Sequence, residues 1–226
     1  MFHIKICGVK VPADVDAVAH SGGDAIGLNF FPPSIRYVDP STACRLSRQA
    51  ATRQLKRIGV FANHSVQQIR DVLGIVELDA VQLHGDEPVD VGEALRNEHV
   101  DLIRAVKLPV GPIDPKTIER LVSPWTDLQA WLLLDADAGS MHGGSGKVLD
   151  WDSIASWASR FERRHWTLAG GLDPDNVAEA IQRSHATSVD VASGSEQPRG
   201  VKSTQRIHQF IAAAGEAFKG RSGTPK

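Results

Sequence analysis

The chain has 226 residues, of which 42% are hydrophobic, and a formal net charge of -2. This size supports one domain with a full core, and the near-neutral charge argues against nucleic-acid and anionic membrane partners. Two cysteines are too few for a disulfide framework, and no apolar run reaches a membrane-spanning length. We therefore expect a cytoplasmic protein without an export signal, whose partners are small molecules.

Short runs rich in Ile, Val and Leu recur along the chain, and longer stretches with the apolar spacing of helices separate them. This alternation is typical of βαβ units, in which parallel strands are buried on both faces. We predict eight strands, at residues 3–9, 24–30, 56–62, 80–85, 102–108, 130–136, 165–171 and 188–194.

The intervening stretches predict eight helices, several of which begin with proline at an early position where its missing N–H costs nothing. They are residues 12–21, 40–50, 66–73, 88–97, 114–121, 151–159, 174–183 and 204–218. Eight strand–helix pairs in this length favour a single-domain (β/α)8 TIM barrel over residues 1–219, with an open doubly wound sheet as the alternative. The polar, helix-breaking residues 220–226 are expected to form a disordered tail.

In such barrels the reacting groups come from the carboxyl ends of the strands and from the loops that follow them. The polar residues expected there are Cys7, Arg36, His84, Asp135 and Asp190. Cys7 ends the first strand, where it could accept a proton or act as a nucleophile. Its alternative role is that of a small buried apolar side chain.

Asp135 follows three leucines, so its carboxylate would be costly to bury unless it faces a pocket or a partner. A helix cap or a salt bridge is its alternative role. In a ring of eight strands, strand six lies three steps from strand one. Cys7 and Asp135 would then approach a substrate from different sides, which suits an acid and a base. His84 lines the pocket or satisfies a buried hydrogen bond, and Cys44 is interpreted as structural.

Two glycine turns predict a phosphate-binding site, namely Ala169-Gly170-Gly171-Leu172 after the seventh strand and Ser193-Gly194-Ser195-Glu196 after the eighth. Barrels of this kind frequently bind phosphate there through backbone N–H groups. The glycine-rich residues 139–147 lack the P-loop spacing, so we interpret them as a lid or an ordinary surface loop. The run His84-Gly85-Asp86-Glu87 is a poor metal site because adjacent side chains do not easily converge on one ion.

The chain resembles the phosphoribosylanthranilate isomerase family through short motifs whose joint order is specific and covers nearly the whole sequence. These motifs are Lys5-Ile6-Cys7-Gly8, Asp24-Ala25-Ile26-Gly27, Ser34-Ile35-Arg36-Tyr37-Val38, Gly59-Val60-Phe61, Val81-Gln82-Leu83-His84-Gly85, Leu133-Leu134-Asp135, Gly143-Gly144-Ser145-Gly146-Lys147, Ala169-Gly170-Gly171-Leu172 with Asn176-Val177, and Val189-Asp190-Val191-Ala192-Ser193-Gly194.

The resemblance implies a cofactor-free Amadori rearrangement in tryptophan biosynthesis, and from the residues we predict no metal site. The rearrangement would convert N-(5'-phosphoribosyl)anthranilate to 1-(2-carboxyphenylamino)-1-deoxyribulose 5-phosphate. By the same resemblance, Asp135 is the general acid at the ribose ring oxygen and Cys7 is the general base at the C2′ proton. Arg36 binds the anthranilate carboxylate, and His84 and Asp190 line the pocket. The phosphate ligands implied are Gly170, Gly171, Ser193, Gly194 and Ser195. A monomer is expected rather than a homodimer.

Two rival functions remain open at this point. A related barrel, the histidine-pathway aminoaldose isomerase or a dual-substrate relative, carries a carboxylate at the end of strand one, and Cys7 argues against it. The second rival is a noncatalytic barrel that binds a phosphorylated metabolite, since a fold by itself carries no activity. Retention of both Cys7 and Asp135 disfavours that function.

Overall fold

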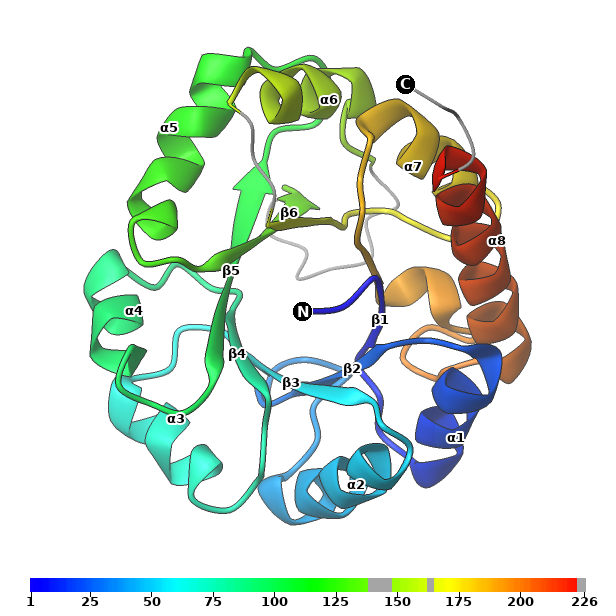
Figure 1. Cartoon of the computed structure of the whole chain (residues 1–226). Coiled ribbons are helices and arrows are strands. Elements are labelled where there is room, and N and C mark those ends of the chain that lie inside the picture. The colour runs from blue at the N-terminus through cyan, green and yellow to red at the C-terminus, as the bar shows by residue number, and fades with distance from the viewer. Residues whose placement is uncertain (138–147, 162–164, 223–226) are drawn as a thin grey trace.

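The computed structural model describes residues 1–137, 148–161 and 165–222, and it shows a closed barrel of eight parallel strands (Figure 1). Each strand pairs with its neighbour in sequence, and β8 returns to pair with β1. The predicted (β/α)8 barrel is therefore confirmed, and the open sheet is excluded. The strands are β1 (Ile4–Cys7), β2 (Ala25–Asn29), β3 (Lys56–Phe61), β4 (Ala80–Leu83), β5 (Asp101–Leu108), β6 (Trp131–Ala136), β7 (Trp166–Leu168) and β8 (Val189–Val191).

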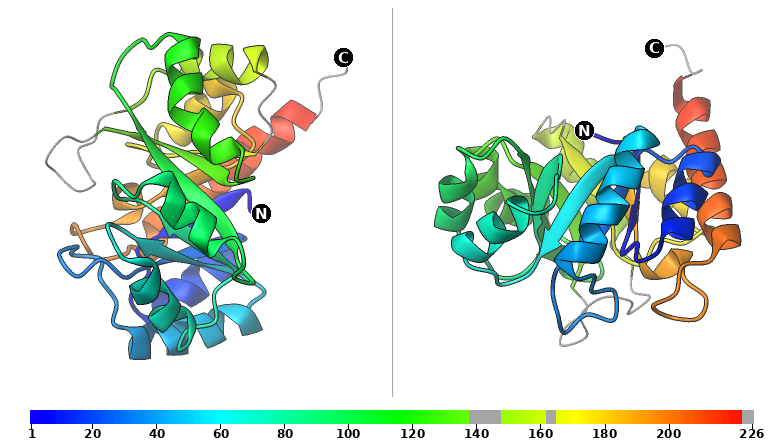
Figure 2. Two further views of the ribbon diagram at one scale, coloured as in Figure 1. Left: turned by 90° about the vertical axis from the view of Figure 1, so that its left-hand side faces the viewer. Right: turned by 90° about the horizontal axis from the view of Figure 1, so that it is seen from below.

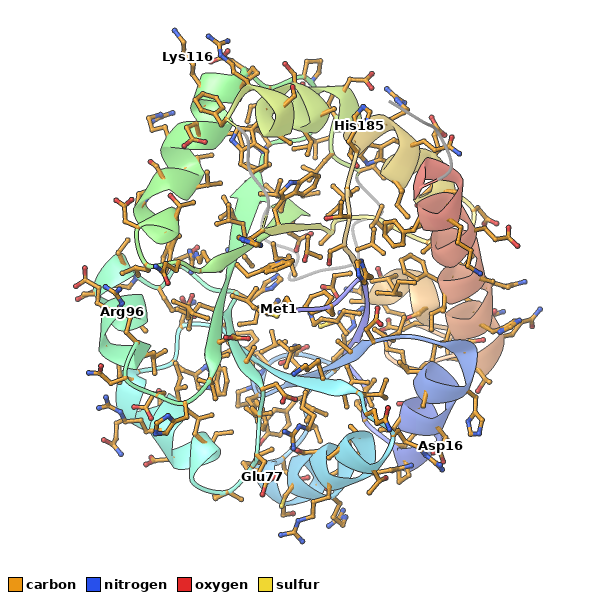
Figure 3. The ribbon with its side chains drawn as sticks, in the orientation of Figure 1. Met1, Asp16, Glu77, Arg96, Lys116 and His185 are labelled. Carbon is orange, nitrogen blue, oxygen red and sulfur yellow. The ribbon has the colours of Figure 1, made fainter. Side chains whose placement is uncertain are left out.

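A helix follows each strand, and together the helices form the outer ring (Figure 1). They are α1 (Pro12–Ser21), α2 (Pro40–Thr52), α3 (Val66–Leu73), α4 (Val89–Leu95), α5 (Pro115–Thr126), α6 (Trp151–Arg160), α7 (Val177–Ser184) and α8 (Thr204–Ser222). Side chains at the outer edge of the ring, such as Arg96 and Lys116, extend away from the barrel (Figure 3). In the described part of the chain, no helix is long and apolar enough to cross a membrane.

Many element ends differ from the prediction by a few residues, among them the ends of β8, α5 and α8. The eighth strand is shorter than residues 188–194, because Ser193–Ser195 form a 3-10 turn, η1. Helix α5 continues past residue 121 to Thr126, although Pro124 lies within it, because Val122 and Trp125 are buried against the core. Helix α8 continues to Ser222, three residues into the segment predicted as a tail.

The strand alternation sorts side chains between two separate apolar layers. Leu132 and Leu134 on β6 face the helices and belong to the large outer core. Leu133 faces the barrel interior, in a second cluster with residues of the other strands. Because successive side chains of a strand point to opposite faces, Asp135 also faces inward, one step nearer the carboxyl end than Leu133. The three leucines before Asp135 therefore fill two layers and leave its carboxylate inside the barrel.

The N-terminus and the loops that follow the strands lie at opposite ends of the barrel. The chain's N-terminus lies at one end, whereas the loops that follow β2 and β8 project from the other (Figure 2, right). Parallel strands bring all their carboxyl ends to the same side. The loop residues predicted to bind substrate are thus brought to a common end of the barrel.

We predict that Leu133→Ala lowers the free energy of unfolding by about 2–5 kcal/mol, because it leaves a cavity in the closed interior. The matched control is Leu121→Ala on α5, where the side chain is 36% exposed, and we expect it to cost at most about 0.5 kcal/mol. Urea unfolding followed by circular dichroism measures both variants. Equal losses in the two variants would contradict an interior layer at Leu133.

Candidate active site

Cys7 is buried at the carboxyl end of β1, and Gly8 and Gly27 leave room for the groups packed around it. Gly27 on the adjacent strand β2 has no side chain, and a Cβ there would lie 2.8 Å from Cys7 Sγ. Gly8 has a φ of 81°, in the left-handed region that glycine tolerates, so the chain turns directly after Cys7. A Cβ on Gly8 would lie 2.6 Å from Arg36 Cδ. Arg36 therefore packs over the turn that follows the thiol.

The charges around Cys7 act on its thiol in opposite directions. Burial raises the pKa of Cys7, and the negative charge of Asp190 adds to that rise. The positive charges of Lys5, Lys202 and Arg36 lower the pKa without cancelling the rise. Since an ordinary thiol has a pKa of about 8.5, Cys7 is mainly protonated at neutral pH in the free protein.

A buried ammonium group lies beneath the thiol. Lys5 precedes Cys7 on the inner face of β1 and is fully buried. Its Nζ lies 3.1 Å from Asp190 Oδ1 on β8 and donates a 2.8 Å hydrogen bond to Gln82 Oε1 on β4. Burial alone would lower the pKa of Lys5, but the charge of Asp190, joined by that of Cys7 when the thiol is ionised, raises it above its ordinary value. Lys5 is therefore a cation inside the barrel.

The polar contacts continue from Gln82 to the proposed acid. Gln82 Nε2 lies 2.7 Å from His84 Nδ1, and His84 Nε2 lies 3.2 Å from Asp135 Oδ2. Gln82 is fully buried, whereas the side chains of His84 and Asp135 are 30% and 24% exposed. The chain of contacts thus rises from the interior toward the carboxyl end, where a substrate can reach Asp135.

Arg36 forms a bidentate ion pair with Glu196. The guanidinium donates through Nε to Glu196 Oε1 at 2.5 Å and through Nη2 to Oε2 at 2.8 Å. Glu196 Oε2 also accepts from the backbone N–H of Gly200, and its Oε1 lies 3.3 Å from Lys202 Nζ. The carboxylate thereby anchors Arg36 to the loop that follows β8.

The charges of this loop cluster are mutually compensating. Burial would raise the pKa of Glu196, but hydrogen bonds from Arg36 and the charge of Lys202 bring it below its ordinary value. Burial lowers the pKa of Lys202, and Glu196 opposes that effect. Lys202 Nζ also donates to the Ala192 carbonyl at 2.7 Å and to Ser195 Oγ at 2.9 Å. Ser195 is fully buried, so its side chain supports the loop internally.

The two predicted glycine turns lie backbone against backbone. A Cβ on Gly194 would lie only 2.0 Å from the Leu172 carbonyl oxygen, so no other residue fits there without displacement of the loops. Gly170 and Gly171 both have positive φ, at 80° and 66°. A Cβ on Gly170 would lie 3.0 Å from Asp135 Oδ1, which brings this turn next to the proposed acid.

Most of the predicted site residues converge on the carboxyl end of the barrel. Asp190 contacts Lys5 below Cys7, His84 contacts Asp135, and Gly170 lies beside Asp135. Residues 139–147, interpreted as a lid or a surface loop, lie outside the described residues. Cys44 is half-buried on α2 and packs against the outer core. No group of three or more metal-ligating side chains is found within the described ranges.

Four buried polar residues of this region were missed as site candidates by the sequence reasoning, namely Lys5, Gln82, Glu196 and Lys202. A signal was present for two of them. Lys5 and Gln82 each stand two residues before a predicted site residue, Cys7 and His84, and therefore share its face of the strand. The other two lie in or after an irregular loop, where no periodicity indicates which way a side chain points.

Comparison with known proteins agrees with this arrangement. The family model of N-(5'-phosphoribosyl)anthranilate isomerase matches residues 4–213. An N-(5'-phosphoribosyl)anthranilate isomerase of Hahella chejuensis is 37% identical over 219 residues, which cover 95% of this chain and 93% of the relative. The crystal structure of phosphoribosyl anthranilate isomerase from Thermotoga maritima superposes with a TM-score of 0.83 at 36% identity, covering 96% of this chain and all of that one.

A further crystal structure holds phosphoribosyl anthranilate isomerase in complex with reduced 1-(o-carboxyphenylamino)-1-deoxyribulose 5-phosphate. It superposes with a TM-score of 0.79 at 34% identity, covering 96% of this chain and all of that one. Another structure of the Thermotoga protein shows monomers generated from its dimeric form. The family match extends over almost the whole barrel and includes every strand that carries a predicted site residue. This chain therefore belongs to the N-(5'-phosphoribosyl)anthranilate isomerase family.

Proposed function

We propose that this protein is the N-(5'-phosphoribosyl)anthranilate isomerase of tryptophan biosynthesis and that it performs an Amadori rearrangement by general acid–base catalysis. The observation that carries the mechanism is the placement of two protonatable side chains, Cys7 and Asp135, on strands three steps apart in the ring. Both lie at the carboxyl end of their strands and face inward. A substrate bound at that end would lie between them.

The chemistry requires one proton to be given and one to be taken. Asp135 protonates the ribose ring oxygen, the bond from C1′ to that oxygen breaks, and an iminium ion forms. Cys7, as the thiolate, removes the proton on C2′ and leaves an enolamine. Transfer of the enol hydroxyl proton to C1′ then yields the aminoketose. Two separate proton transfers, one to the ring oxygen and one from C2′, explain the need for two groups on different sides.

The remaining site residues bind the two ends of the substrate. The glycine turns that contain Gly171 and Gly194 offer backbone N–H groups to the phosphate. Arg36 binds the anthranilate carboxylate. Because Glu196 engages one N–H each of Nε and Nη2, the N–H groups of Nη1 and the second N–H of Nη2 are those through which Arg36 can bind a carboxylate and keep its ion pair. Ser195 contributes indirectly, since its hydroxyl is bonded within the loop.

We predict that Cys7→Ala and Asp135→Asn each lower kcat by about 10²–10⁴-fold, the range over which general acid–base groups contribute. The measurement is loss of fluorescence after the protein is added to freshly generated phosphoribosylanthranilate. Cys44→Ala on α2 and Asp101→Asn at the opposite end of the barrel are the matched controls, expected to retain wild-type rates. Unchanged turnover in both active-site variants would favour the noncatalytic barrel.

The histidine-pathway rival is tested in the same assay format. We expect no appreciable turnover of the histidine-pathway aminoaldose, because that reaction is associated with a carboxylate in place of Cys7. Appreciable turnover would show that the single-substrate assignment is too narrow.

The monomer expected from the sequence stays a prediction. Because the Thermotoga relative has a dimeric form, light scattering on this protein is the measurement that checks it.

The protonation state of Cys7 can be followed by alkylation. Only the thiolate reacts, and burial raises the pKa of Cys7, so the rate should increase with pH through a midpoint above the ordinary thiol value of about 8.5. Iodoacetamide labelling of the Cys44→Ser variant, followed by mass spectrometry between about pH 7 and about pH 10, reports on Cys7 alone. A small free thiol treated in parallel provides the reference. A midpoint at or below that of the free thiol would contradict the burial effect.

A further inference from the structure

A continuous set of polar contacts crosses the barrel interior from β8 to β6. It runs from Asp190 to Lys5 at 3.1 Å, from Lys5 to Gln82 at 2.8 Å, from Gln82 to His84 at 2.7 Å and from His84 to Asp135 at 3.2 Å. These five residues come from four strands or the residue that directly follows one. The mechanism above uses Asp135 but assigns no part to Gln82 or Lys5.

The direction of each hydrogen bond follows from what each group can donate. A lysine ammonium has three donors and no acceptor, so the atom of Gln82 that faces Lys5 has to be its carbonyl oxygen. The amide nitrogen of Gln82 therefore faces His84 and donates to Nδ1. Because Gln82 and Lys5 are both fully buried, the opposite amide orientation would set two donors against each other without water to satisfy them.

The orientation of Gln82 determines the tautomer of His84. Nδ1 accepts the amide proton, so it carries a lone pair and the ring proton is on Nε2. Nε2 then donates to Asp135 Oδ2. Since Oδ2 faces a donor, a proton on Asp135 is favoured on Oδ1 instead. Oδ1 is the oxygen beside Gly170, where a side chain is missing and the turn after β7 begins.

We propose that Gln82, oriented by the Lys5 ammonium, is a positioning residue that holds His84 in its Nε2–H tautomer and thereby directs the acid proton of Asp135 to Oδ1. Lys5 is held in turn by Asp190. The catalytic proton is thus presented away from His84, on the side of the turn that follows β7. The proposal rests on the proposed function for the role of Asp135, whereas the tautomer of His84 follows from the contacts alone.

The direct test is the ¹⁵N NMR spectrum of the imidazoles at neutral pH. The chain has nine histidines, and the difference spectrum against His84→Gln assigns the ring of interest. We expect an unprotonated Nδ1 and a protonated Nε2 in the wild-type protein. A protonated Nδ1 would overturn the proposal, and this measurement depends on no variant of Gln82.

In the variant Gln82→Glu we expect His84 to change its tautomer. A carboxylate can accept from Lys5 and also from an Nδ1–H group, so we expect the Nδ1 signal to move to the protonated position. Turnover should fall because Nε2 carries a lone pair in the Nδ1–H tautomer and no longer donates to Oδ2. The expected loss in kcat is about 10²-fold, near the lower end for a general acid, with KM changed by less than about threefold.

Two further variants separate this effect from a loss of structure. Gln82→Leu removes both hydrogen bonds at similar size, and we expect a mixture of His84 tautomers with an intermediate kcat. Gln209→Glu on the exposed face of α8 introduces the same charge change and should leave both the His84 signals and kcat as in the wild type. If Gln82→Glu left the His84 signals unchanged, the positioning role would be excluded.

Failure of the proposed function gives a different result. In that case the wild-type protein would show the expected His84 tautomer and no turnover of phosphoribosylanthranilate. Turnover by the wild type that is insensitive to Gln82→Glu, with the tautomer reversed in the spectrum, would support the isomerase and overturn the claim that His84 directs the proton. The spectrum and the rate therefore report on the two statements separately.

Discussion

The buried ammonium of Lys5 is the charge on which the polar interior of this barrel depends. A cation without solvent contact is stable only when anions and acceptors surround it. Asp190 and Gln82 supply those groups from β8 and β4. Because β1 lies between β8 and β2 in the ring, Lys5 reaches both a neighbouring strand and one further away. The orientation of Gln82, and through it that of His84, follows from the donor-only chemistry of this one group.

Close approach of backbones is the second constraint on the site. Gly27 leaves room for the thiol of Cys7, and Gly194 lets the loop after β8 touch the loop after β7. Arg36 lies over the turn at Gly8 and is held there by Glu196. The result places a thiol, a guanidinium and two glycine turns at one end of the barrel. An anionic substrate with a carboxylate and a phosphate at opposite ends matches this distribution of charge and backbone donors.

Family membership and the physical arrangement support the same function by separate routes. The relatives identify the reaction class, while the positions of Asp135 and Cys7 support the mechanism proposed above. The raised pKa of Cys7 also has a consequence for the mechanism, because a base that is mainly protonated when the site is empty must lose its proton before it can act. Lys5, Lys202 and Arg36 are the positive charges that favour that ionisation.

The sequence by itself determined the order of eight strands and eight helices, because apolar periodicity and helix-start signals are local properties. It favoured a barrel, but the open sheet was excluded only by the pairing of β8 with β1. It also placed Cys7 and Asp135 at strand ends. Only the tertiary structure decided the pairs that span the chain: Lys5 with Gln82, 77 residues apart, and Arg36 with Glu196, 160 residues apart. Such pairs leave no local pattern, since they exist only after the ring closes and brings distant strands and loops within hydrogen-bonding distance.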